Sequence, residues 1–335
     1  MARRRCLALA SAALVLTACS TEPVDGPASG SPQQSAEPEQ TASPSSEPTA
    51  EPSTPAEPEP EPEPVSSDDL DTGTAVAAVQ HLAGRIGPRE ATSRAFHRAA
   101  DWVAAGFERA GYDVERQGVR APAGVSWDGV PVPAGRSENV VATPPGFDPT
   151  EPHLVVGAHL DTVPQAPGAE DNASGVGVML AVADAAAGRR TRLPVVFVAF
   201  GAEEPRGAPE DHHYGSRRYV ELMSARERSA VRGMVSMDRV GVGVAVPIGS
   251  AGDGDPLQRA LLAAARRLGV PAVPDPGQRS SDHWSFVRAG MPGARLGSTP
   301  YAAYHDASDV PAVVSPAQLR RVGRIVLAWL APAPR

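Results

Sequence analysis

Two runs of branched apolar residues constrain the fold of this chain more than any other feature. They are "HLVVGAHLD" at 153–161 and "LPVVFVAFGAEE" at 193–204, and each has the length of a buried strand. The helical pattern "ASGVGVMLAVADAAAG" at 173–188 lies between them, and strand, helix and strand in this order favour a parallel sheet. We therefore predict a single α/β domain with three layers, helix, sheet and helix, around a mostly parallel, twisted central sheet.

The other elements expected in this domain continue the alternation. Amphipathic patterns predict helices, several of them ended by a glycine, and short apolar runs predict strands. The expected helices span 93–111, 215–233, 255–269 and 315–331, and the expected strands span 112–119, 138–143, 233–241 and 294–298.

The first twenty residues are typical of an exported bacterial protein. Three arginines precede an apolar stretch of about a dozen residues, which is shorter than the roughly twenty that a membrane span needs. The residues "LTAC", Leu16–Cys19, resemble the lipobox of bacterial lipoproteins, in which the cysteine becomes the lipid-bearing first residue. We predict a signal peptide over 1–18 and a lipid on Cys19, which would anchor the protein on the extracellular face of the cell membrane. Ordinary signal cleavage nearby, with release of the protein, is the alternative.

Residues 19–70 are rich in Pro, Glu, Ser and Thr and have almost nothing apolar to bury. We predict a disordered spacer there, which at roughly 3 Å per residue could hold the domain over 71–335 on the order of 100 Å from a membrane. Of the two cysteines, Cys6 leaves with the signal and Cys19 would carry lipid. A disulfide, a thiolate metal site and a cysteine nucleophile are thereby excluded, so any metal must be bound by His, Asp or Glu.

The charge of the chain lies mainly in the spacer. The net charge is −8, but residues 20–69 hold 12 acidic and no basic side chains. From residue 70 onward, 27 acidic residues face 28 basic ones. The domain has no basic surplus of the kind that nucleic-acid binding requires, so no nucleic-acid partner is expected.

Acidic and imidazole side chains follow the predicted strands where each strand ends. His159 and Asp161 follow one strand, Glu203 and Glu204 the next, and Asp238 a third. Ligands of open parallel sheets bind beyond the carboxyl ends of the strands, so these side chains should converge. Two adjacent glutamates repel unless a cation lies between them, and a metal ion would let one carboxylate bind it while the other deprotonates water. The alternative for this pair is a solvated acidic turn.

Six short motifs occur in order along the domain. They are "AHLD", "EDNASG", "GAEE" followed by "YGS", "SMD", "SSDHWSF" and "YHDASD". With these motifs the domain resembles, over residues 75–333, the co-catalytic di-zinc aminopeptidases, similar to secreted bacterial leucyl aminopeptidases. That family also includes glutamate carboxypeptidases, glutaminyl cyclases and the metal-free transferrin receptor ectodomain.

The resemblance implies two zinc ions per chain, held by five ligands. It gives His159 and Asp238 to one ion and Glu204 and His305 to the other, with Asp171 bridging the two. The region 71–335 would then be a zinc peptidase domain with the fold of that family.

The resemblance also implies roles for residues beside the ligands. Glu203 would be the general base on a water that bridges the two ions, Asp161 would support the imidazole of His159, and the Tyr304 hydroxyl would stabilise an oxyanion. A cis peptide is expected between Asp171 and Asn172. Glu170 is interpreted as a solvated neighbour of the bridging aspartate.

Several residues near these motifs have open interpretations. The stretch that contains His212 and His213 is longer than the short turn usual in the family, and we expect it to be a surface loop at the rim of the pocket. The side chain of Arg239 should point away from Asp238 if both lie on one strand, which favours a structural role. Arg206, Arg239 and Arg279 remain candidates for a clamp on a substrate carboxylate.

The function expected from this resemblance is that of a membrane-tethered, monomeric zinc aminopeptidase, a hydrolase that cleaves the N-terminal bond of peptides. Five carboxylates around two ions leave an acidic surplus that suits a free amine, and an apolar first residue is expected. The main alternative is a di-zinc carboxypeptidase or amidohydrolase. Asp171 follows His159 by 12 residues, and Asp238 follows Glu204 by 34. Both separations are shorter than those expected in that family, which argues against this alternative. A glutaminyl cyclase and a binding domain without catalytic activity are further alternatives. The presence of all five expected metal ligands argues against both.

Overall fold

Residues 61–208, 212–252 and 254–333 are described in the computed structural model of the chain. The predicted signal peptide, Cys19 and the spacer up to residue 60 lie outside the described residues. Residues 64–70, the predicted end of the spacer, are instead part of the domain. Val65 is buried, and its N–H donates to the carbonyl of Arg190 at 3.0 Å. Hydrophobic burial and main-chain pairing therefore fix this segment, and the domain begins before residue 71.

The central sheet has eight strands and confirms the predicted mostly parallel core. Their order is β1 (Asp113–Ala121), β4 (Gly135–Thr143), β6 (Val195–Phe200), β5 (His153–His159), β7 (Val231–Met237), β10 (Gly293–Leu296), β8 (Val246–Ser250) and β9 (Ala272–Pro276). The four strands β6, β5, β7 and β10 are mutually parallel, and β8 and β9 form another parallel pair. Pairs β1–β4, β4–β6 and β10–β8 are antiparallel. Every residue of β5 and β6 is buried, as their apolar runs predict.

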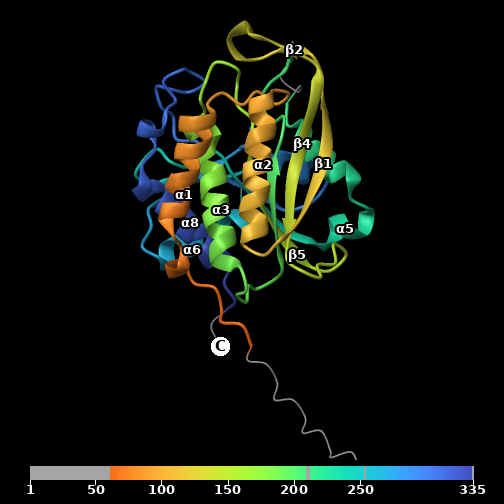
Figure 1. The fold of residues 1–335 in the computed structure, drawn as a ribbon. Coiled ribbons are helices and arrows are strands. Elements are labelled where there is room, and N and C mark those ends of the chain that lie inside the picture. The colour runs from red at the N-terminus through yellow and green to blue at the C-terminus, as the bar shows by residue number, and fades with distance from the viewer. Residues whose placement is uncertain (1–60, 209–211, 253, 334–335) are drawn as a thin grey trace, which may run out of the picture. The chain divides into compact units, whose positions relative to one another are not determined.

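Helices cover both faces of the sheet and complete the predicted three layers. One face carries α1 (Thr72–Val79), α2 (Arg94–Arg109), α3 (Gly175–Ala186), α6 (Pro256–Arg267) and α8 (Pro316–Leu330), which share the main hydrophobic core (Figure 1). The other face carries α4 (Tyr214–Leu222) and α7 (His283–Arg288). Helix α3 lies close to α1 because Gly177 has no side chain; a Cβ there would lie 2.6 Å from the carbonyl oxygen of Ala75.

The predicted helix over 215–233 is wrong in its length. Helix α4 ends at Leu222, and α5 (Ala225–Ala230) begins anew because Ser224 and Glu227 form a capping box that favours a helix start. Strand β7 then begins at Val231. Within the described residues, no helix combines the length and the apolar character that a membrane crossing requires.

Several short elements were not predicted. The short helical turns are η1 (Ser67–Asp69), η2 (Gln80–Ile86), η3 (Trp127–Gly129), η4 (Ala169–Ser174) and η5 (Pro311–Val313). A small antiparallel hairpin joins β2 (Gly124–Val125) to β3 (Pro131–Val132) between the two long strands β1 and β4. This hairpin, with η3 at its tip, contributes to the site described next.

Candidate metal centre

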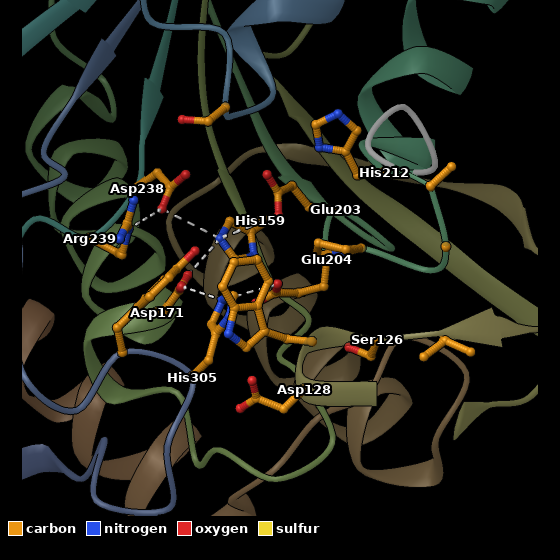
Figure 2. A pocket seen from close by; sticks show the side chains of 17 residues that line it. Ser126, Asp128, His159, Asp171, Glu203, Glu204, His212, Asp238, Arg239 and His305 are labelled. Atoms are coloured by element: carbon orange, nitrogen blue, oxygen red, sulfur yellow. Dashed lines mark ion pairs between the residues drawn. The ribbon is translucent and has the colours of Figure 1, made fainter. Parts of the chain in front are cut away.

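The predicted ligands meet at the carboxyl ends of the central parallel strands. His159 is the last residue of β5, Glu204 follows β6, and Asp238 follows β7. Asp171 comes from η4 and His305 from the loop after β10, and all five side chains are buried (Figure 2). The structure thus brings together every residue predicted to bind metal.

The donor atoms of these five residues form two groups that share Asp171. His159 Nε2 lies 3.1 Å from Asp171 Oδ1 and 3.6 Å from Asp238 Oδ1. On the other side of Asp171, His305 Nε2 lies 3.2 Å from Oδ2 and 3.3 Å from Glu204 Oε2. In each group the donor atoms lie within 4.8 Å of one another. Two sets of imidazole and carboxylate donors joined by one carboxylate fit a pair of divalent ions such as zinc.

The electrostatics of the centre also favour cations. Burial raises the pKa of Glu203 and of Glu204 to about 8, and neighbouring carboxylates add to this effect. Burial alone would lower the pKa of His305, but Glu204 and Asp171 raise it to about 10. The buried carboxylates also hold more negative charge than the nearby side chains neutralise, which adds to the rise in all three pKa values. Divalent cations would supply the missing positive charge, because metal binding replaces protons on such ligands.

The bridging Asp171 is held by its main chain. The two carboxylate oxygens of Asp309 accept the N–H groups of Glu170 and Asp171 at 2.9 and 3.1 Å. The peptide between Asp171 and Asn172 is cis, as the resemblance implies. Before this turn, the buried guanidinium of Arg89 donates to the carbonyls of Leu160, Pro167 and Gly168, and so fixes the loop between His159 and Asp171.

The interpretation of Glu170 as a solvated residue is wrong. Its side chain is buried, and its carboxylate accepts the N–H groups of Gly241 and Val242 at 2.7 and 3.0 Å. Burial raises the pKa of Glu170 to about 8. The residue therefore joins η4 to the loop after β7, which carries Asp238.

Asp161 supports the glutamate pair rather than only the imidazole beside it. Its carboxylate oxygens accept the N–H groups of Glu203 at 3.0 Å and Glu204 at 3.2 Å. His159 Nδ1 lies 3.2 Å from the main-chain oxygen of Asp161 and 3.9 Å from its Oδ1. The main chain of Asp161 thus orients the imidazole, and its carboxylate fixes the backbone of the pair.

Glu203 lies outside the set that Asp171 bridges, although one of its carboxylate oxygens lies within 4.8 Å of donor atoms of His159 and Glu204. Its Oε2 lies 4.0 Å from His159 Nε2, and its Oε1 lies 2.9 Å from His213 Nε2. The expectation that His213 lies on the surface is wrong, because its side chain is buried, and burial lowers its pKa to about 3. His213 directly precedes α4, and its φ is +58°. The long loop therefore ends with a turn at His213, whose side chain is directed into the protein. His212 lines the pocket.

Aromatic rings and arginines surround the ligands. The ring of Tyr304 stacks on His305 at 3.8 Å, and the ring of Trp127 lies 5.0 Å from His305 at a steep angle. The guanidinium of Arg239 lies 4.3 Å from the centre of the Tyr304 ring. Burial raises the pKa of Tyr304, so its hydroxyl keeps its proton and can donate. Arg295, which the sequence did not suggest, places Nη2 3.0 Å from Asp238 Oδ2 and fixes that ligand from behind.

The centre opens into a cavity of about 690 Å³. Its walls include Val125, Ser126, Trp127 and Asp128 from the β2–β3 hairpin, together with Tyr304 and Arg239. Arg206 holds this hairpin, since its guanidinium donates to the carbonyls of Pro122 and Pro133 and pairs with Glu90. The approach is so close that a Cβ on Gly124 would clash with the main chain of Arg206.

Comparisons with known proteins agree with this candidate metal centre. Residues 139–330 match peptidase family M28. Aminopeptidase YwaD of Bacillus subtilis is 29% identical over 186 residues, which cover 52% of this chain and 40% of that protein. This chain spans two fifths or less of the length of the curated relatives that it matches.

Solved structures share the fold. A zinc aminopeptidase from Bacillus subtilis, BSAP, superposes with a TM-score of 0.71 at 19% identity, over 79% of this chain and 96% of that chain. A glutaminyl cyclase from Porphyromonas gingivalis gives a TM-score of 0.67 at 21% identity, over 78% and 98%. At this level of identity the likeness concerns the fold, and the residues of the site must separate the two activities.

Proposed function

The chain belongs to peptidase family M28, and from this membership and the site we propose that it is a zinc aminopeptidase that removes the first residue of peptides. One observation carries the proposal. Asp171 presents one oxygen to each of two His and carboxylate groups, and Glu203 faces both groups from the same cavity. An aminopeptidase with 29% sequence identity and a zinc aminopeptidase with the same fold support it.

Five residues would hold the two zinc ions. His159 and Asp238 would bind one ion and Glu204 and His305 the other, with Asp171 shared between them. Bound zinc supplies Lewis acidity, which polarises the scissile carbonyl and lowers the pKa of water.

Glu203 moves the proton in the proposed reaction. Its buried carboxylate takes a proton from the attacking water and later gives it to the nitrogen of the leaving amine, so that the bond between carbonyl carbon and nitrogen breaks. Asp161 accepts the N–H of Glu203 and so fixes its backbone. His213 contacts Oε1 of Glu203, which leaves Oε2 directed toward His159 and the other metal ligands. Tyr304 lines the cavity, and its hydroxyl would donate to the oxygen on which negative charge develops.

The residues of the site bear differently on the alternatives expected from the sequence. A glutaminyl cyclase keeps fewer metal ligands, whereas all five ligand side chains converge here. A carboxypeptidase needs a free cation at the substrate carboxylate. Arg206 is buried and bound to the hairpin, and Arg279 is exposed with its guanidinium 5.1 Å from the Trp284 ring. Arg239 alone of the three candidates lines the cavity.

We also propose the cellular setting from the sequence. A signal peptide over 1–18, a lipid on Cys19 and the Pro-rich spacer would tether a monomeric domain to the outer face of the membrane, where peptides are its substrates.

The proposal is tested with two chromogenic substrates. The protein should hydrolyse leucine 4-nitroanilide and leave N-acetyl-leucine 4-nitroanilide intact, because acetylation removes the free amine. The Glu203→Gln variant serves as the background control. Equal cleavage of the acetylated substrate, or release of residues only from the C-terminus of peptides, would contradict an aminopeptidase.

A further inference from the structure

Arg239 occupies a place in the cavity that sequence reasoning does not predict. It follows β7, but its φ is +59°, so the chain turns and its side chain does not point away from Asp238. Nε of Arg239 lies 3.7 Å from Asp238 Oδ1, and the residue lines the cavity beside Asp171 and Tyr304 (Figure 2). A permanent positive charge therefore lies next to the bridged ligands.

The backbone of Arg239 is held from both sides. Its N–H donates to Asn172 Oδ1 at 3.2 Å, and its carbonyl accepts the N–H of Ser298 at 3.0 Å. Gly297 packs against the same peptide, where a Cβ would lie 2.5 Å from the carbonyl oxygen of Arg239. These contacts stabilise a left-handed conformation that is uncommon for a residue with a side chain. The position of the guanidinium is thus built into the loop.

The side chain of Arg239 is also oriented before any substrate binds. Its guanidinium lies over the ring of Tyr304, and Nη2 donates to Ser298 Oγ at 2.8 Å. A guanidinium has five N–H donors, and these contacts use one of them. A planar group fixed in this way is suited to a bidentate pair with a carboxylate.

Arg239 is the cation of the centre that can accept a further partner. Arg295 is buried and its guanidinium pairs with Asp238 at 3.0 Å, whereas Arg239 lines the cavity and lies 3.7 Å from the same carboxylate. Divalent ions bound to Asp171 and Asp238 would offset much of the negative charge that these ligands place beside Arg239. The guanidinium of Arg239 would then be able to pair with an anionic group of the substrate.

One further acid, Asp128, lines the cavity. Asp128 is exposed at the tip of the hairpin, where solvent screens its charge, and Figure 2 shows it apart from Arg239. An anion and an amine could thus be bound in different parts of one cavity.

We propose that Arg239 binds a carboxylate of the substrate, so that the enzyme favours peptides with an acidic group beside the bond it cleaves. The inference rests on the proposed peptidase function, and only a carboxylate on the first side chain would replace the expected preference for an apolar first residue. The carboxylate can come from two sources: the side chain of a first Asp or Glu, or the free C-terminus of a dipeptide.

Two matched pairs of substrates distinguish these sources. Glutamyl and glutaminyl 4-nitroanilide differ only in the charge of the first side chain, and Leu-Gly and Leu-Gly amide differ only at the C-terminus. For each pair, the ratio of kcat/KM values is measured for the wild type, Arg239→Met, Arg239→Lys and the control Arg279→Met. Ratios cancel any general loss of activity or of folded protein. Binding of Glu-Gly amide and Gln-Gly amide to the zinc-loaded Glu203→Gln protein, by isothermal titration calorimetry, gives a readout without turnover.

We expect the wild type to favour the charged member of one pair by about 10- to 100-fold, the size expected for a hydrogen bond between charged groups. Arg239→Met should bring that ratio close to one, Arg239→Lys should keep part of it, and Arg279→Met should leave it intact. The pair that responds identifies the source of the carboxylate. Ratios and affinities that Arg239→Met does not change would overturn the inference, whereas failure to cleave any free-amine substrate would count against the proposed function instead.

Discussion

Asp161→Asn should destabilise the domain and misplace the general base, because Asp161 accepts two buried main-chain N–H groups. These come from Glu203 at 3.0 Å and Glu204 at 3.2 Å. Asn offers one carbonyl oxygen, so its amide group would face the second N–H, donor against donor. One lost hydrogen bond to a charged group and one unsatisfied N–H should together lower the free energy of unfolding by about 2 to 4 kcal/mol. For a domain of this size that corresponds to roughly 4 to 8 °C in Tm.

The assay compares thermal unfolding, kcat and zinc content of the wild type and Asp161→Asn. Because a shift of about 1 Å in a reacting group can cost about 100-fold in rate, kcat should fall by one to two orders of magnitude. The Tm difference should persist after chelation of the metal, since the hydrogen bonds involve no metal. Asp306→Asn is the matched control, because Asp306 carries the same substitution on an exposed loop and should leave Tm unchanged.

A different pattern would refute this reasoning. If Asp161→Asn lost zinc affinity but kept the Tm of the metal-free protein, Asp161 would act through the imidazole of His159. The role of its carboxylate in fixing the glutamate backbone would then be wrong.

Three further predictions follow from individual residues. Glu203→Gln should abolish turnover and keep the zinc content, whereas Glu204→Gln should lower the zinc content; the reverse result, by metal analysis and kinetics, would exchange their roles. Cys19→Ser should release an active protein from the membrane fraction, and retention there would indicate another anchor. Burial lowers the pKa of His153 below its ordinary value of 6.5, so the unfolded chain gains a proton first and stability should fall as the pH drops below about 6.5. Denaturant unfolding at pH 7.5 and 5.5 should show a smaller loss for His153→Gln, and equal losses would exclude that residue as a cause.

The parts of the site that the sequence predicts lie at the ends of regular elements. His159, Glu204 and Asp238 directly follow apolar runs of strand length, and parallel strands place their carboxyl ends at one edge. Their convergence follows from the topology. Asp171 lies in η4 and His305 in the loop after β10. The resemblance to a known family indicated the bridging role of Asp171 and the role of His305 as a ligand.

The parts that were missed depend on loop conformation and on distant contacts. Arg239 was expected on an extended strand, and its left-handed turn depends on Asn172 and Gly297, which lie far away in sequence or in the next loop. His213 was placed on the surface because no acidic partner was expected for it, although it lies 2.9 Å from Glu203 and is buried at the residue before α4. The charge of Arg295 reaches Asp238 only because β10 pairs with β7. No local pattern carries such information.

Titration of the metal-free protein with zinc tests the central claim most directly. Hydrolysis of leucine 4-nitroanilide is followed while zinc is added, and the bound metal is counted at each point. Two donor groups that share Asp171 predict that activity reaches its plateau at two zinc ions per chain. Full activity with one bound ion per chain, or hydrolysis that does not depend on zinc, would contradict a two-metal peptidase.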